Sequence, residues 1–359
     1  MTAEYYSSLA LVSGAAVYTL ATLVHAAEWA AARTPATPAV AAPVPVRALA
    51  RVGGPGLPDA DLPDPDLPDP DLPDPDPRPS DRVEPDLLES ARPDLHLSPV
   101  PNTSGAAAVE GRVEVLGRAG LALTAVGFGL SLGGVVLRGV AAGRAPWGNM
   151  LEFVTTAMVG VVAVYLVLVW RTGARWLGLP VATLAALANG LAVTVFYVAV
   201  APLVPALHSV WFLIHIVAAT ISAAAFNIGA LTAVLYLLKA RAERRGTAPG
   251  YLARLPEARN LDRLSYRFHA FGFPLWTFTV AAGAIWAQYA WGRYWGWDPK
   301  ETWALVTWVI YACYLHARST AGWKGRRAAG LAVLGVATFW FNFIGINLLV
   351  SGLHSYAGV

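Results

Sequence analysis

Residues 291–303 combine aromatic rings, glycines and charged side chains at a spacing that suits ligand binding. The rings of this segment are Trp291, Tyr294, Trp295, Trp297 and Trp303. Trp and Tyr gather at membrane interfaces, but an interfacial belt needs only one or two of them. Flat rings separated by glycine are typical of a surface for a large, flat, apolar ligand. We therefore predict that this segment, called the aromatic ribbon below, binds such a ligand at the membrane surface.

Histidines near the ribbon could supply ligands to a metal inside that flat molecule. His208 and His215 are seven residues apart, which returns two side chains to nearly the same face of a helix. His354 follows the last apolar run of the chain. A six-coordinate haem iron takes an imidazole on each side of a planar porphyrin, so these residues favour haem. His208 is equally well explained as an interfacial residue at a helix end.

Four further histidines carry weaker predictions. His316 lies near the inner end of an apolar run, where an ionisable group is usually functional. His25 ends the first run, His96 lies in a Pro-rich segment, and His269 starts the sixth run. We expect these three to be structural.

Asp298, Pro299 and Glu301 form a complete helix start within the ribbon. Asp at the N-cap, Pro at the first helical position and Glu at the third position satisfy the first backbone N–H groups of a helix. This arrangement would hold the ribbon rigidly on the following helix without any ligand. The turn at residues 146–152, with Trp147, could add a wall to the same cavity or be an interfacial helix start.

Composition predicts an all-α, polytopic membrane bundle. The chain has 359 residues, of which 56% are hydrophobic and only 14% are charged, whereas a soluble domain has about a quarter charged residues. Several apolar runs reach the roughly 20 residues needed to cross a bilayer. The eight expected helices are 5–28, 115–137, 149–170, 180–200, 209–239, 270–290, 302–318 and 329–350. The single Cys313 excludes a CxxC site within the chain, so thiol chemistry must come from a partner.

Residues 30–112 differ from the rest of the chain and divide it into parts. This segment is rich in Pro and Ala and repeats Leu-Pro-Asp-Pro-Asp from Leu62, Leu67 and Leu72. Dense Pro blocks helix and sheet, and the aspartates repel one another, so we expect a disordered insert. The predicted parts are a first transmembrane helix at 1–29, the insert, and a transmembrane domain at 113–359.

Lysine and arginine predict the orientation, because they concentrate in cytoplasmic loops. The segments at about 239–269 and 318–328 are rich in arginine and hold one lysine each, and Arg171 and Arg175 add a third basic loop. With eight spans these loops fall on one side, which places the insert in the cytoplasm and both termini and the ribbon outside. Arg138 and Arg144 oppose this orientation. A multi-pass protein of the cell membrane is expected.

The ribbon resembles the tryptophan-rich WWD motif of the haem-handling protein family. The pattern is Trp291-Gly-x-x-Trp-x-Trp-Asp-Pro-Lys-Glu301, and further similar segments are 261–267, 314–318, 342–348 and 352–356. Residues 115–359 are most similar to the CcsA/ResC branch, the haem-binding subunit of the system II cytochrome c synthase. The first span and the insert lie outside the resemblance.

The resemblance implies a cytochrome c biogenesis function for these residues. Haem b would be exported to the outer face and held there by Trp291, Tyr294, Trp295, Trp297 and Asp298, with His215 and His354 as axial ligands. His316 would belong to an inner haem site on the export route. The implied partners are a CcsB/ResB-type membrane protein, which contributes a second intramembrane histidine, and an apocytochrome c with a CxxCH segment. His25 is a weak candidate for that second histidine on this chain.

Two other functions remain open from the residues. A haem carrier that delivers to a separate ligase, as in the CcmC branch, would use the same surface, although that branch is shorter. A transporter that couples protons through intramembrane histidines would leave the ribbon unexplained. As a synthase subunit the chain would act as a lyase, mainly by positioning two reactants, because it supplies no nucleophile of its own.

Overall fold

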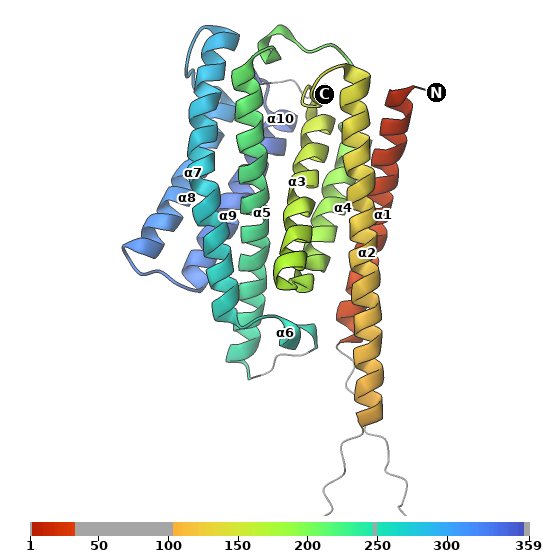
Figure 1. Cartoon of the computed structure of the whole chain (residues 1–359). Helices are drawn as coiled ribbons and strands as arrows, with labels where there is room; N and C mark the ends of the chain where they lie inside the picture. The colour runs from red at the N-terminus through yellow and green to blue at the C-terminus, as the bar shows by residue number, and fades with distance from the viewer. Residues whose placement is uncertain (1, 33–102, 247–249, 355–359) are drawn as a thin grey trace, which may run out of the picture. The chain divides into compact units, whose positions relative to one another are not determined.

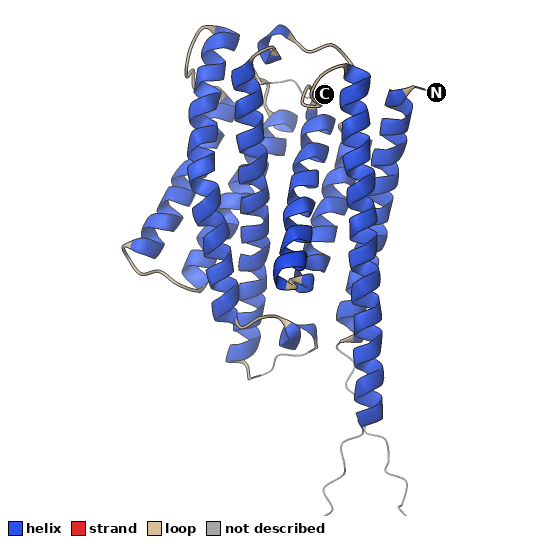
Figure 2. Cartoon of the chain, in the orientation of Figure 1, coloured by secondary structure: helices blue, strands red, loops and turns tan. Residues whose placement is uncertain are grey.

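The computed structural model describes residues 2–32, 103–246 and 250–354, and within these ranges every regular element is helical (Figure 2). The long helices are α1 (Ala3–Ala31), α2 (Thr103–Ala142), α3 (Met150–Thr172), α4 (Gly178–Thr194), α5 (Val210–Arg244), α7 (Ala258–Trp291), α8 (Pro299–Ser319) and α9 (Arg326–Trp340). The shorter elements are η3 (Arg175–Leu177), η4 (Pro205–Leu207), α6 (Tyr251–Arg254), the π-helix η5 (Phe341–Gly345) and α10 (Ile346–Leu349).

The predicted polytopic helical bundle is confirmed. Among the described residues, seven helical segments are long and apolar enough to cross a membrane. The remaining long helix, α8, has 21 residues but carries Lys300 and Glu301 in its first turn and His316 and Arg318 in its last. Its polar ends lower its hydropathy, although it contains the whole of the seventh predicted span, 302–318. The chain is a multi-pass membrane protein.

The second helix begins earlier than the sequence predicts. We expected it at residue 115, whereas α2 begins at Thr103 and runs for 40 residues. Several alanines lie between Thr103 and the predicted start, and alanine has the highest helix propensity. The predicted transmembrane domain boundary at 113 therefore falls inside a helix. Residues 33–102, which hold most of the predicted insert and His96, lie outside the described residues.

Small residues bring α5 and α7 close together along most of their length. A Cβ atom at Gly272 would lie 2.8 Å from the Phe226 ring, and one at Gly283 would lie 2.8 Å from the His215 ring. Such close approach replaces the hydrophobic driving force that helices lack inside a lipid bilayer. The α5–α7 pair forms one side of the cavity described below.

The bundle has two chemically different ends (Figure 1). The N-terminus, the start of α5 and the end of the described C-terminal segment lie at one end, at the top of the view. The basic region between α5 and α7 lies at the other end. This distribution agrees with the charge asymmetry from which the sequence predicts the orientation.

The two arginines that oppose the predicted orientation form a largely buried charged group with Glu152. Arg138 is 1% exposed and its Nε lies 3.1 Å from Glu152, while the Nη1 atom of Arg144 lies 2.8 Å from the same carboxylate. The Arg138 guanidinium also donates to the carbonyl of Val198. Because these charges are paired with one acid, they link α2 to α3 and differ from the exposed arginines that make up most of the basic loops.

Candidate functional site

The connection between α7 and α8 is held rigidly by the predicted helix start, which the structure confirms. Asp298 and Glu301 form a reciprocal capping box at the N-terminus of α8. The Glu301 carboxylate also accepts the backbone N–H of Gly296 at 2.8 Å and lies 3.2 Å from Arg293. The ribbon is therefore anchored through its charged residues, while its rings remain available for packing or binding.

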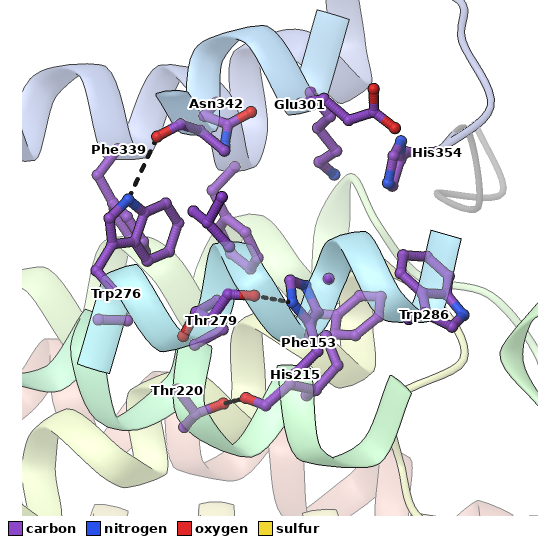
Figure 3. Close-up of a pocket in the computed structure, with 18 of the residues that line it drawn as sticks. Phe153, His215, Thr220, Trp276, Thr279, Trp286, Glu301, Phe339, Asn342 and His354 are labelled. Carbon is purple, nitrogen blue, oxygen red and sulfur yellow. Dashed lines mark hydrogen bonds between the residues drawn. The ribbon is translucent and has the colours of Figure 1, made fainter. Parts of the chain in front are cut away.

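A cavity opens beside this connection and holds about 1320 Å³ of empty space, including its mouth. Its walls come from α3, α5, α7, α8, α9 and the C-terminal segment (Figure 3). The lining is mainly apolar and aromatic, with Phe153, Phe212 and Trp286 among the larger side chains. An apolar cavity with few polar groups is the usual form of a site for a small organic ligand.

His215 lines this cavity from the second turn of α5. Its Nδ1 atom lies 2.8 Å from the backbone carbonyl oxygen of Thr279 on α7, and the bond is drawn in Figure 3. A carbonyl oxygen only accepts, so Nδ1 carries the proton and donates it. Nε2 then keeps its lone pair, which is the form of histidine that binds a metal.

His354 lines the same cavity from the C-terminal segment (Figure 3). Its Nδ1 atom lies 2.8 Å from Oδ1 of Asp298, and the backbone N–H of Leu353 donates to Oδ2 of the same residue at 2.8 Å. Carboxylate–histidine pairs of this kind fix the ring orientation and raise the basicity of the other ring nitrogen. His354 is therefore prepared in the same tautomer as His215.

Asp298 is the residue that joins the helix start to the histidine. Burial raises the pKa of its carboxyl, but hydrogen bonds from His354 and the backbone of Leu353 outweigh this effect and lower the pKa from 3.8 to about 2. The carboxylate is thus ionised across the physiological pH range and remains an acceptor for the His354 N–H. We identify Asp298 as a positioning residue.

The rings of the ribbon take different positions. Tyr294 and Trp295 line the cavity. Trp291 packs edge-on against the His354 ring with centroids 4.7 Å apart, and Trp303 packs against Phe341 at 4.3 Å. Trp297 is 68% exposed and does not line the cavity. Only part of the predicted ring surface therefore faces the space between the histidines.

The backbone conformation of Trp297 explains why its ring points away from the cavity. Among the described residues it is the one non-glycine residue with a positive φ, at 60°. Such a conformation costs about 1–3 kcal/mol in a residue with a side chain. The turn that brings Asp298 into its capping position therefore carries an exposed indole on a strained backbone.

Three lining residues on α7 were not among the predicted site residues. Trp276, Thr279 and Trp286 line the cavity, and the indole N–H of Trp286 donates to the carbonyl of Ala206 at 2.7 Å. With Gly283, these residues follow a spacing of three and four along one helix face. This periodicity is the sequence pattern from which these lining residues could have been predicted. The π-helix η5 also directs Asn342 into the cavity, where its buried Oδ1 has no partner among the described residues.

The turn before α3 contributes to the same walls. Asn149 caps α3 by accepting the N–H of Glu152 at 3.0 Å, which confirms the predicted helix start. Met150 and Phe153 from the first turn line the cavity, whereas Trp147 packs behind it against the cluster around Phe212.

The remaining described histidines do not reach this cavity. His208 is exposed at the end of η4, and His316 is exposed in the last turn of α8. His25 and His269 are 1% and 0% exposed, and each has a buried Nε2 without a partner among the described residues. The structure therefore brings His215 and His354 together and keeps the other predicted candidates apart from them.

Comparison with known proteins places this arrangement in a family. The family model described as "Cytochrome C assembly protein" matches residues 147–354, which include both cavity histidines. The chain is 35% identical over 298 residues to the cytochrome c biogenesis protein CcsA of Picosynechococcus sp., a match that covers 67% of this chain and 87% of the relative. It is 34% identical to CcsA of Synechococcus sp. JA-3-3Ab, over 68% of this chain and 87% of the relative. A shorter match of 171 residues to CcsA of Guillardia theta reaches 47% identity, over 44% of this chain and 57% of that relative.

Proposed function

This chain belongs to the cytochrome c assembly protein family, and from that premise we propose that it binds haem in the outer cavity and presents it for attachment to apocytochrome c. A role in cytochrome c biogenesis follows from the family. Haem is the cargo that such a role requires, because c-type cytochromes carry haem joined through thioether bonds.

The two cavity histidines are the observation that carries the proposal. Each ring has its Nδ1 proton engaged by an oxygen 2.8 Å away, which leaves Nε2 of His215 and Nε2 of His354 as metal-binding atoms at one cavity. Two neutral imidazoles and an apolar, aromatic lining fit the requirements of a six-coordinate haem. Among the described residues, no group of three or more His, Cys, Asp or Glu is placed to hold a metal ion.

Attachment requires only that the cargo and two thiols be held together. Each thioether forms by addition of a thiol S–H across a vinyl C=C bond, which makes one C–S bond and one C–H bond without an oxidant. The thiols come from the apocytochrome, since Cys313 is exposed on α8 and does not line the cavity. The contribution of this chain is positioning, which can supply a large part of the rate.

The route of haem to this cavity is the less direct part of the proposal. His316 lies in the last turn of α8, at the opposite end of this helix from the ribbon, and its ring is exposed. We place it at an inner haem site whose second histidine comes from a CcsB/ResB-type membrane partner. The ribbon and both termini then lie outside the cell membrane, with the basic loops in the cytoplasm.

Reconstitution tests the synthase function. The chain, its membrane partner, haem, reductant and an apocytochrome with a CxxCH segment should yield covalent haem, detected by haem staining after denaturing electrophoresis. An apocytochrome with both cysteines replaced by alanine is the control and should remain unstained. If covalent product requires a further ligase while haem still binds to His215 and His354, the chain is a carrier and the synthase assignment is wrong.

A further inference from the structure

The outer cavity carries a cation that the described acids leave unpaired. Lys300 and Glu301 are the formally charged side chains in the described lining, apart from the histidines. Glu301 is engaged by Arg293 and by backbone N–H groups of the ribbon. Asp298 is engaged by His354 and by the backbone of Leu353 and Lys300. Within the described ranges, the Lys300 ammonium takes part in no hydrogen bond or ion pair, although its backbone N–H is used to cap α8.

An unpaired ammonium in an apolar cavity is unfavourable unless something compensates it. Burial lowers the pKa of Lys300 to about 8, and the neighbouring Asp298 carboxylate raises it in part. The first turn of a helix is also an unfavourable position for a cation, because the helix dipole is positive there. The cap of α8 uses only the backbone N–H of Lys300, so the partly buried ammonium remains available to an anionic group of a ligand in the cavity.

We infer that the Lys300 ammonium binds a propionate carboxylate of the haem held between His215 and His354, an assignment that rests on the proposed haem function. The two propionates are the anionic side chains of haem b, and the cavity offers them no other unpaired cation within the described residues. An ion pair in a partly desolvated site is stronger than one on an exposed surface.

This contact would fix the rotation of the porphyrin about the axis through the iron. Two axial imidazoles hold the iron but leave the ring free to turn in its plane. A propionate bound beside the N-terminus of α8 removes that freedom, and the vinyl-bearing edge then points away from Lys300. Attachment needs the vinyl groups in a defined place, so Lys300 would contribute by orienting the haem.

The test compares haem with its dimethyl ester, in which both carboxylates are blocked. Each ligand is titrated into detergent-purified protein, and binding is followed by the Soret band. The quantity measured is the dissociation constant of the ester divided by that of haem. Because the same micelles are used throughout, the change in this ratio between proteins cancels the different partitioning of the two ligands into detergent.

The wild-type protein and Lys324→Met, a control in the exposed loop between α8 and α9, should show the same ratio. Lys300→Met should lower that ratio roughly tenfold, which corresponds to one charge-assisted contact, and Lys300→Arg should retain it. Lys300→Gln provides a second neutral variant if the Met variant does not fold. In every variant the spectrum should remain that of a bis-histidine haem.

The two proposals fail in different ways. An unchanged ratio in Lys300→Met and Lys300→Gln, with a normal bis-histidine spectrum, overturns the Lys300 assignment and leaves haem binding intact. Absence of a spectrum that depends on His215 and His354 in the wild-type protein overturns the haem proposal and this inference with it.

Discussion

Two pairs of histidines have the same local chemistry but different surroundings. His215 and His354 line the outer cavity, whereas His25 and His269 are enclosed within the helix bundle. The Nδ1 atom of each ring lies close to an oxygen, at 2.8 Å for His215, 2.8 Å for His354, 3.0 Å for His25 and 2.7 Å for His269. The hydrogen bond alone therefore does not separate a ligand from a packed residue.

The two pairs differ in the space available around their rings. A Cβ atom at Gly120 would lie 2.6 Å from the His25 ring, and one at Gly229 would lie 2.6 Å from the His269 ring. These rings fill gaps that glycine leaves between helices, as the His215 ring also does at Gly283, but unlike His215 they do not line the outer cavity. The outer rings face an open cavity with aromatic walls. Access to the outer cavity therefore distinguishes the two proposed ligands, His215 and His354, from the enclosed His25 and His269.

Replacing the histidines should give the largest contrast. His215→Ala and His354→Ala each remove one proposed axial ligand, so the six-coordinate absorption spectrum should be lost in both variants. His25→Ala and His269→Ala should keep that spectrum in whatever fraction of the protein folds. An outer variant with an unchanged spectrum would show that another residue holds the iron.

Asp298→Asn should give the next largest effect. Asparagine caps a helix as well as aspartate does, so the melting temperature should stay nearly constant. The neutral amide no longer draws the proton of His354 as strongly, and such changes around a ligand typically lower metal affinity about 10- to 100-fold. A lower melting temperature that accompanies the loss of haem affinity would instead mean that Asp298 acts by stabilising the fold.

Gly120→Ala tests whether the His25 ring is closely packed against α2. The added methyl group would overlap the His25 ring, and overpacking of this kind costs about 1–3 kcal/mol. Gly129→Ala is the matched control on the same helix, since nothing described lies within 4 Å of its added Cβ. Thermal unfolding in detergent should show a lower midpoint for Gly120→Ala and an unchanged or higher one for Gly129→Ala. Similar midpoints for the two variants would argue against close packing at His25.

The smallest effect is expected at the exposed indole. Trp297→Gly relieves a positive φ and removes a ring that does not line the cavity, so haem affinity should stay within about twofold of the wild-type value. Trp295→Ala removes a lining ring and should weaken haem binding by about 1 kcal/mol or more. Equal losses in the two variants, measured by Soret titration, would mean that Trp297 folds onto the bound ligand.

The sequence was most informative where local patterns decide the structure. Apolar runs predicted the helices, and the Asp298-Pro-Lys-Glu301 pattern predicted the start of α8, because hydropathy and capping depend on residues close in the chain. His208, His215 and His354 were candidates from their place beside the ribbon, and the family resemblance selected His215 and His354, which the structure brings to one cavity.

Features that depend on tertiary packing could not be predicted in the same way. The exposed position of Trp297 follows from a turn whose positive φ is not encoded by a glycine. The walls formed by Trp276 and Trp286 depend on which face of α7 meets α5 and α8. The pairing of Arg138 and Arg144 with Glu152 joins residues from α2, from the segment after it and from α3. Each of these depends on contacts between elements, which a single sequence does not show.

The absorption spectrum of the detergent-purified wild-type protein, recorded with added haem in the ferric and ferrous states, tests the central claim most directly. Ligation by His215 and His354 predicts a low-spin, six-coordinate haem in both oxidation states. A high-spin, five-coordinate spectrum or no specific haem binding would contradict the account, because the outer cavity would then not hold haem between two histidines.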